Sequence, residues 1–288
     1  MTDYHVPTAD ADSKPLESDL DRSTKYNRQG INKHALGDLV GAIAEYDRAI
    51  SLNNNYFQAY NNRGLAKGQI GDLAGAIADY NRAINLDNNY AKAYYNRGRA
   101  RIKAGNISQA IADYSWAIKH DAHYAKAYYN RGLAKLELND KKEAIVDFDR
   151  AISVDSNYAK AYYQRGNIQH DLGDNVAAIA DYDRAISIAP EYIKALYNRG
   201  NIKCETGDNL GAISDYDLAI AIDPNYARAY YNRALNKIVL KDRVSAISDF
   251  DRAANLFHQQ GDLDNYNKAI KKQTSAYDIS DRSSKDRP

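Results

Sequence analysis

The sequence predicts an all-α solenoid, built from seven copies of one 34-residue unit and closed by a C-terminal capping helix. The main observation is self-similarity: the stretch Ala91–Tyr124 matches the rest of the array at successive shifts of 34 residues, with no insertion or deletion. A fixed period of this length indicates stacked supersecondary units instead of one globular core. The predicted repeats are residues 23–56, 57–90, 91–124, 125–158, 159–192, 193–226 and 227–260.

Each repeat is expected to hold two helices, at about repeat positions 2–14 and 17–30. The step between them, as in Gly71-Asp72, joins a helix-terminating glycine to an N-cap residue. In the second helix an aromatic at position 24 and an isoleucine at position 28 lie four residues apart, on one face, where they can fill the space against the next repeat. Glycine at position 8 and alanine at position 20 are small, so the two helices should approach closely there.

These residues resemble the tetratricopeptide repeat family. Position 8 is Gly in six repeats and Ala234 in the seventh, positions 20 and 27 are always Ala, and position 24 is always Tyr or Phe. Tyr or Leu replaces the family's Trp at position 4, and Arg replaces its Leu at position 7 in six repeats. The resemblance implies a right-handed superhelix of helix–turn–helix units. It also implies a non-catalytic scaffold or adaptor that binds segments of other proteins.

The two ends of the chain differ from the repeats. Residues 1–22 are polar and contain Pro7 and Pro15, and they are expected to form a disordered tail because they hold too little apolar surface to offset the entropy of ordering. Residues 261–278 follow an amphipathic pattern that predicts a helix covering the open end of the stack. Residues 279–288 are expected to be a loose C-terminal tail.

Composition limits the classes of function. Lys+Arg 39 against Asp+Glu 38 leaves a net charge of +1, which gives no basic footprint for nucleic acid. The single cysteine, Cys204, fits a reducing compartment and has no base beside it in the sequence, so it is expected to be inert. No apolar leader or membrane-length apolar run occurs. The expectation is a cytoplasmic protein without a cofactor, and the segments outside the repeats are too short for a catalytic domain.

A repeated charge pair is expected inside the stack. Position 7 is Arg in six repeats, and position 23 is acidic in all seven. Because the family usually places Leu at position 7, the guanidinium should be partly buried, and an unpaired one would cost several kcal/mol. Arg–acid bridges are therefore predicted, and the sequence leaves open whether they form within one repeat or between neighbours. A catalytic role is not favoured, because no copy of the pair differs from the others.

The candidate binding face lies on the first helix of each repeat, where positions 2, 5, 6, 9 and 13 share one side. In proteins that this chain resembles, this side lines the concave groove that receives a partner peptide. The amides at position 6 can donate and accept hydrogen bonds side by side, and their row resembles the asparagine ladder of O-linked glycosyltransferases that act on proteins. The candidate residues are Asn62, Asn96, Asn130, Gln164, Asn198 and Asn232 at position 6, Lys92, Lys126, Lys160, Lys194 and Arg228 at position 2, and Tyr95, Tyr129, Tyr163, Tyr197 and Tyr231 at position 5.

Two other interpretations stay open. The amides can instead satisfy neighbouring groups while the tyrosines pack between repeats, or the chain can associate with itself through its exposed ends or Trp116. Trp116 is the only tryptophan and replaces an arginine that recurs at position 26. A monomer is favoured over a homo-oligomer. Nucleic-acid binding by the position-2 row is disfavoured by the net charge.

More specialised sites are not predicted. A chaperone-type carboxylate clamp would need a lysine where Tyr163 stands and an arginine where Asn232 stands. His120 and His123 flank the end of a helix, but the pattern places no third metal ligand near them. The sequence identifies neither the partner nor its pathway.

Overall fold

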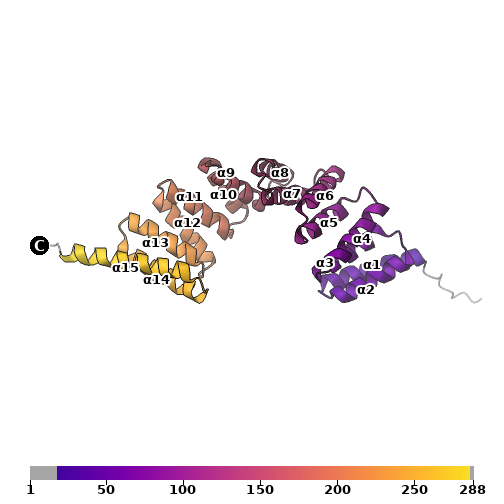
Figure 1. Ribbon diagram of the computed structural model, residues 1–288, viewed down its shortest axis with the longest axis horizontal. Helices are drawn as coiled ribbons and strands as arrows, with labels where there is room; N and C mark the ends of the chain where they lie inside the picture. Colours follow the sequence, from indigo (N-terminus) through magenta and orange to yellow (C-terminus); the bar gives the residue numbers. More distant parts are fainter. Residues whose placement is uncertain (1–17, 286–288) are drawn as a thin grey trace, which may run out of the picture. The chain divides into compact units, whose positions relative to one another are not determined.

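The computed structural model describes the backbone of residues 18–285 and the side chains of residues 18–277. The described residues form fifteen α-helices and no strand, and successive helices run back and forth along the chain (Figure 1). By their internal contacts the residues divide into two compact units, Met1–Asn139 and Asp140–Pro288, here called the N-terminal unit and the C-terminal unit. The predicted all-helical solenoid is thus confirmed.

The N-terminal unit stacks its helices in sequence order, each packed against the next. The first helix of a repeat packs against the second, and the second packs against the first helix of the following repeat. Its helices are α1 (Asp19–Ala35), α2 (Leu39–Leu52), α3 (Phe57–Gln69), α4 (Leu73–Leu86), α5 (Ala91–Lys103), α6 (Ile107–His120) and α7 (Ala125–Glu137).

The C-terminal unit repeats this arrangement and ends in a longer helix, α15, that packs against α14. Its helices are α8 (Lys141–Val154), α9 (Ala159–Asp171), α10 (Asn175–Ile188), α11 (Ile193–Glu205), α12 (Asn209–Ile222), α13 (Ala227–Val239), α14 (Arg243–Gln259) and α15 (Leu263–Lys285).

The turn between the two helices of a repeat follows from positions 15 and 16. Gly71 has a φ of 92°, a left-handed conformation that glycine adopts without a steric penalty. Asp72 then caps α4, since its Oδ1 accepts a hydrogen bond from the Gly75 amide at 2.8 Å. Position 15 keeps this conformation without glycine in two repeats, as Asn139 (φ 61°) and Lys241 (φ 67°). The left-handed conformation of position 15 is thus kept in the repeats that lack glycine there.

The expected close approach of the two helices is present at position 8. A Cβ placed on Gly98 would lie 2.7 Å from the ring of Tyr114, and one on Gly64 would lie 2.8 Å from Tyr80. Position 24, where both rings stand, is almost fully buried. The glycine thus makes room for the aromatic ring of its own repeat, and Ala234 takes its place where that ring is Phe250.

The ends of the helical array differ from the expected boundaries. Helix α1 begins at Asp19 and not after residue 22, because Ser18 caps it and Asp19 and Asp21 lie in its first turn, where the helix dipole favours acidic residues. Residues 1–17, the rest of the expected tail, lie outside the described residues. Helix α15 continues to Lys285, so the expected loose tail from 279 is helical up to that residue. The reason is that no glycine or proline follows Gly261 until Pro288, so no residue terminates the helix earlier.

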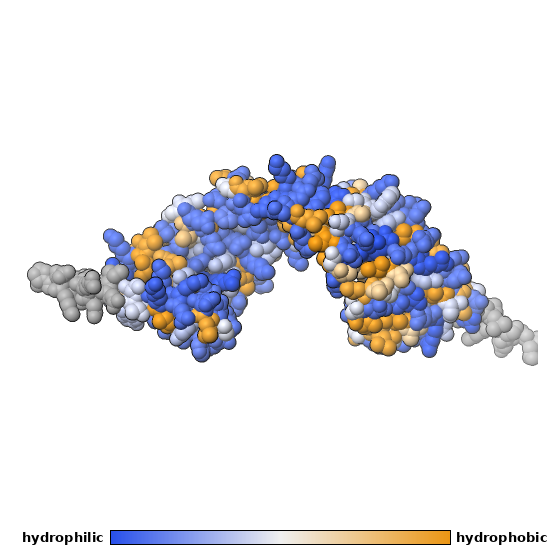
Figure 2. Space-filling view, in the orientation of Figure 1, coloured by the Kyte–Doolittle hydropathy of each residue, from blue (hydrophilic) through white to orange (hydrophobic). Residues whose placement is uncertain are grey.

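Hydrophilic residues cover most of the face seen in Figure 2, and hydrophobic residues gather in separate patches between them. Among the helices that the structure describes, none is both long and apolar enough to cross a membrane.

Candidate functional site

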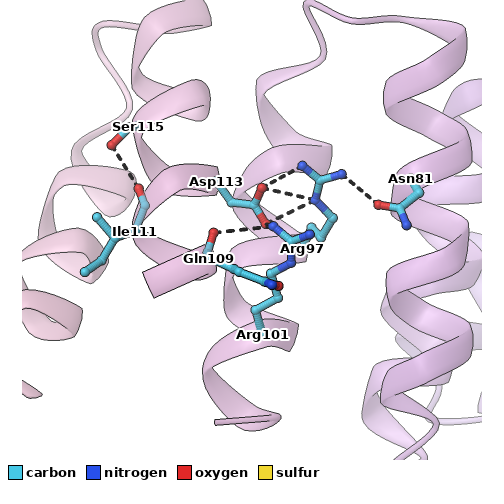
Figure 3. A network of polar contacts seen from close by, with 7 residues as sticks. All are labelled: Asn81, Arg97, Arg101, Gln109, Ile111, Asp113 and Ser115. Carbon is cyan, nitrogen blue, oxygen red and sulfur yellow. Dashed lines mark hydrogen bonds and ion pairs between the residues drawn. The ribbon is translucent and has the colours of Figure 1, made fainter. Parts of the chain in front are cut away.

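The predicted Arg–acid pairs form a network that joins three helices (Figure 3). Within the third repeat, Arg97 donates from Nε and Nη2 to the buried carboxylate of Asp113, the shorter contact being 2.6 Å. Its Nη1 reaches back to the preceding repeat and donates to Asn81 at 2.7 Å. Arg101 donates to the other oxygen of Asp113 at 2.8 Å. One guanidinium thus ties the two helices of its own repeat to the repeat before it.

This geometry answers the question that the sequence left open, because the arginines of five repeats (Arg63, Arg97, Arg165, Arg199 and Arg233) bond both within their own repeat and to the previous one. In four of them, position 7 binds the acid at position 23 of its own repeat and the acid at position 25 of the repeat before. The pairs are Arg63 with Asp79 and Asp47, Arg165 with Asp181 and Asp149, Arg199 with Asp215 and Asp183, and Arg233 with Asp249 and Asp217. The hydrogen bond to Asp181 is the largest cause that raises the pKa of Arg165 above its ordinary value. The pairs are structural elements of the stack.

The position-6 amides connect neighbouring repeats in the N-terminal unit. The Asn62 side-chain nitrogen donates to Asn27 Oδ1 at 3.1 Å, and that of Asn96 donates to Asn61 Oδ1 at 2.9 Å. In the fourth repeat the acceptor is a tyrosine, since Asn130 donates to the Tyr95 hydroxyl at 3.1 Å. Each acceptor stands at position 5 of the preceding repeat.

The C-terminal unit adds a second acceptor to the same link. Asn198 donates to the Tyr163 hydroxyl at 3.3 Å and to Asn167 Oδ1 at 2.9 Å. Asn232 likewise donates to the Tyr197 hydroxyl at 3.0 Å and to Asn201 Oδ1 at 2.9 Å. The asparagine at position 9 also accepts from a buried tyrosine, Tyr182 in the case of Asn167.

These bonds decide what the amides can offer to a partner. A primary amide has two N–H donors, and both are used in Asn198, in Asn232 and in Asn130, whose second donor goes to the Lys126 carbonyl. Their side-chain oxygens are the groups left for another molecule. Gln164 differs, because its Oε1 accepts from Asn167.

The position-5 tyrosines lie mostly between repeats. Tyr95 is 9% exposed, and its ring lies 4.7 Å from that of Tyr124 and 5.9 Å from that of Tyr114. Burial raises the pKa of Tyr95, although Arg99 and the hydrogen bond from Asn130 act in the opposite direction. The other four position-5 tyrosines, Tyr129, Tyr163, Tyr197 and Tyr231, are partly buried. The rings of Tyr163, Tyr197 and Tyr231 also pack against aromatic rings.

The position-2 cations form an exposed row near the beginning of each first helix. Because position 2 precedes position 6 by about one turn, these side chains flank the amides on one edge of the face. The exposed members are Lys92, Lys126, Lys160, Lys194 and Arg228.

Positions 9 and 13 of the same face hold functional candidates that the repeating rows do not reveal. In the N-terminal unit, Arg99 and Lys103 line a hollow together with Leu65 and Leu73. In the C-terminal unit, Asn201 and Glu205 occupy the same two positions and line hollows there. These positions vary from repeat to repeat, so only a comparison of single repeats across the face could have found them.

Trp116 lies on the second helix of the third repeat and is 44% exposed. Its ring stacks on Tyr94 and His120, with centroids 6.1 and 5.8 Å away, and Lys119 Nζ lies 4.4 Å above it. In the second repeat Arg82 covers Tyr60 from the same position, so Trp116 takes over the place of a stacking arginine.

The remaining candidates lack the partners that chemistry would need. His123 is exposed, and His120 is partly buried in the aromatic stack. Within the described residues no group of three or more His, Cys, Asp or Glu side chains could hold a metal ion. Cys204 is a free, partly buried thiol that lines the hollow beside Asn201.

The paired helices, the glycine–aromatic contact and the 34-residue spacing are all features of one family. The family model described as "TPR repeat" matches residues 33–71, 69–105, 98–139 and 200–235, and the one described as "Tetratricopeptide repeat" matches 125–158 and 159–192. Together these matches cover more than half of the chain, which therefore belongs to the tetratricopeptide repeat family. Proteins of this family are typically non-catalytic and generally mediate interactions between proteins.

Solved structures of the family show the same fold. The crystal structure of MamA is 27% identical to this chain, covers 57% of it and 96% of its own length, and has a TM-score of 0.53. PilF of Pseudomonas aeruginosa reaches a TM-score of 0.63 at 19% identity, over 75% of this chain and 97% of its own. YrrB, described as a TPR protein with an unusual peptide-binding site, is 24% identical over 64% of this chain and 95% of its own, with a TM-score of 0.54. A search among curated proteins gave no match.

Proposed function

We propose that this chain is a non-catalytic cytoplasmic scaffold that binds an extended segment of another protein on the face formed by the first helices of its repeats. The observation that carries the proposal is the row of position-6 amides. The preceding repeat accepts both donors of Asn198 and Asn232 and one donor of Asn130, whose other donor binds the Lys126 carbonyl, so their oxygens are held in place before a partner arrives. A preorganised acceptor loses little side-chain entropy on binding.

The residues around the amides have two different roles in this proposal. The exposed row of Lys92, Lys126, Lys160, Lys194 and Arg228 would contact the partner directly. The position-5 tyrosines would act mainly through their hydroxyls, which hold the amides, because their rings pack between repeats.

Several repeats must act together. A neutral hydrogen bond contributes about 0.5–1.5 kcal/mol, whereas ordering a flexible segment costs about 2–5 kcal/mol. One amide therefore cannot hold a peptide, and a footprint of four or five repeats gives roughly micromolar affinity. The proposed protein is a monomer without a cofactor, and its partner is a protein and not a nucleic acid.

The test compares two variants with the same change of charge. Lys126→Glu/Lys194→Glu alters one exposed residue of the face in each unit. Lys119→Glu/Lys142→Glu alters one exposed residue of a second helix in each unit. Tagged proteins are used to capture partners from host extract, after circular dichroism shows that both variants are helical. We expect the first variant to lose the partners that the wild type and the second variant retain. Equal recovery by all three would place binding elsewhere.

The alternative function is a self-associating solenoid, which Trp116 favours because it is a large apolar residue at 44% exposure. Sedimentation velocity over a wide concentration range separates the two functions. A scaffold keeps one sedimentation coefficient until a partner is added, whereas a self-associating protein sediments faster as its concentration rises.

A further inference from the structure

The C-terminal unit carries a continuous groove on this face, here called the amide groove. One hollow over α9 and α11 is lined by Asn167 and Asn198, and the next, over α11 and α13, by Asn232 and Asn236. Both hollows include Asn201 and Glu205, so they join into one groove across three helices.

A buried acceptor in the amide groove has no partner within the described residues. The Asn236 side chain is 1% exposed, and its nitrogen donates to the Asn232 carbonyl at 2.8 Å. Its Oδ1 is buried and makes no hydrogen bond. Buried polar groups are normally satisfied, so this oxygen marks a place where a donor of a bound molecule would be favoured.

Most of the polar groups in the amide groove are acceptors. The nitrogens of Asn198 and Asn232 are occupied, so they present oxygens, as does Asn236. In the described residues, Asn201 keeps an unused amide nitrogen, which suits a carbonyl of a peptide backbone. An extended peptide offers N–H and C=O groups in alternation. The side-chain oxygens of the amide groove can accept from its N–H groups, and the Asn201 nitrogen can donate to a C=O group.

The stretch of this face from α11 to α15 begins at an acidic group, Glu205, where the two hollows join. Glu205 is 54% exposed, and its carboxylate lies 3.8 Å from Nε2 of His170. Asp171 lies at the same repeat position on α9, and it is paired with Lys141 at 2.8 Å. Lys203 does not neutralise Glu205, because it binds the buried carboxylate of Asp215 at 2.9 Å. Glu205 is therefore the carboxylate available to a basic side chain.

The other end is basic. On α15, Lys268, Lys271 and Lys272 are exposed and line a further hollow with Tyr231 of α13. Tyr231 lies one helical turn from Leu235, which lines the amide groove, so the two surfaces adjoin. Leu235 and the exposed Val239 place apolar side chains between the acidic and the basic ends.

We infer that the C-terminal unit binds an extended protein segment whose charge is ordered: a basic residue against Glu205, apolar residues over Leu235, and acidic residues against the α15 lysines. Neighbouring helices pack about 8–10 Å apart, so the path from Glu205 on α11 to the lysines of α15 is about 16–20 Å, or about five or six extended residues. This inference rests on the proposed function and adds the class of partner.

The test uses labelled synthetic peptides of about eight residues with capped ends, so that the charged ends lie about five or six residues apart. The first has two arginines at one end, leucine and valine in the middle and two glutamates at the other end, and it is made in both orders because the chain direction is free. In two further peptides serines replace either the arginines or the glutamates. Fluorescence anisotropy measures the Kd of each for the full chain.

We expect the wild type to bind one order of the first peptide about tenfold more tightly than either serine peptide, because each charged end contributes a pair at the edge of the groove. Glu205→Gln should weaken the first peptide about tenfold and leave the peptide without arginines unchanged. Lys271→Gln/Lys272→Gln should do the same for the glutamate end. The matched control is Arg99→Gln/Lys103→Gln, at the equivalent positions of the N-terminal unit, which should change none of these Kd values.

Three results would overturn the inference: no binding of the first peptide, equal binding of all peptides, or equal loss in the control variant. The proposed function is judged separately by the capture experiment. If partners are still lost by Lys126→Glu/Lys194→Glu while no charged peptide binds, the face is used but the inferred class of partner is wrong.

Discussion

The two units of this chain share one internal framework and differ on the face that the framework supports. Arg97–Asp113 in the N-terminal unit and Arg199–Asp215 in the C-terminal unit form the same pair with nearly the same burial, and in both a second cation binds the buried carboxylate. Around their hollows, position 13 changes charge from Lys103 in the N-terminal unit to Glu205 in the C-terminal unit, and position 9 changes from the cation Arg99 to the neutral Asn201.

This difference separates stability from specificity. The acid at position 23 is buried against two cations, and its loss would leave a guanidinium unpaired, so packing fixes its identity. Lys103 and Glu205 are exposed side chains on a helix that is held by its other faces, so their charge can change at little cost in stability. Recognition can therefore differ between the units while the fold stays the same.

The largest effect should come from alkaline pH, which acts on the framework of both units. Burial raises the pKa of Tyr46 in the N-terminal unit to about 12, and that of Tyr226 in the C-terminal unit to about 12. The unfolded phenol titrates near pH 10, so between about pH 10 and 12 the folded state binds more protons. The contribution of these buried phenols to the free energy of unfolding is complete below pH 10 and is lost as the pH rises through 12. Urea titrations followed by circular dichroism at constant ionic strength should show both units losing helicity in this window.

The control for this prediction is Tyr46→Phe, which removes one titrating group and should make the urea midpoint less dependent on pH. A midpoint that is the same at pH 9 and pH 11.5 would show that the buried phenols do not control alkaline unfolding.

The next largest effect should follow from removing the buried acid. Asp113→Ala in the N-terminal unit and Asp215→Ala in the C-terminal unit should each lower the free energy of unfolding by about 3–5 kcal/mol, because an arginine is left buried without its partner. Changing the exposed Asp183, which also accepts from Arg199, to alanine should lower the free energy of unfolding by about 1 kcal/mol or less. Urea unfolding measures all three. Clearly unequal losses for Asp113 and Asp215 would contradict a shared framework.

Two glycines of one helix should respond in opposite directions. Gly64→Ala places a Cβ 2.8 Å from the Tyr80 ring and 3.1 Å from a backbone oxygen, which should destabilise the fold by about 1–3 kcal/mol. Gly68→Ala, one turn later, meets only Ala76 Cβ at 3.7 Å and should stabilise the helix by about 0.5–1 kcal/mol. Thermal unfolding of both variants beside the wild type gives the sign directly. The same sign for both would refute the close approach at position 8.

The smallest effect on stability should come from Trp116→Arg. This change introduces the residue type that the second repeat has at the same position, where Arg82 stands. Arginine can stack over Tyr94 as Arg82 stacks over Tyr60, so the free energy of unfolding should change by about 0.5 kcal/mol or less. The same variant should leave the sedimentation coefficient unchanged at all concentrations. If the sedimentation coefficient of the wild type rises with concentration and that of the variant does not, Trp116 is a self-association site. That result would contradict the proposal of a monomeric scaffold.

The sequence by itself determined the repeat, its two helices and the small residues between them, because these depend on local spacing. Gly71 and Asp72 mark the turn by their own conformational preferences, and the period of 34 residues places every copy in register. The Arg–acid pairs could be expected because arginine stands where the family usually places Leu and because an acid recurs at position 23 of every repeat. The ends of α1 and α15 could be placed only roughly, since helix ends depend on caps and terminators that a polar stretch does not make obvious.

The tertiary structure decided how the rows are used. That Arg97 reaches two repeats at once, and that Asn198 gives both its donors to the repeat before it, depend on distances between helices that one period of sequence does not contain. The amide groove likewise joins Asn201 and Glu205 of one repeat with Asn236 of the next. A local pattern sets which side of a helix a residue occupies, whereas the partner of a side chain is set by the packing of helices far apart in the sequence.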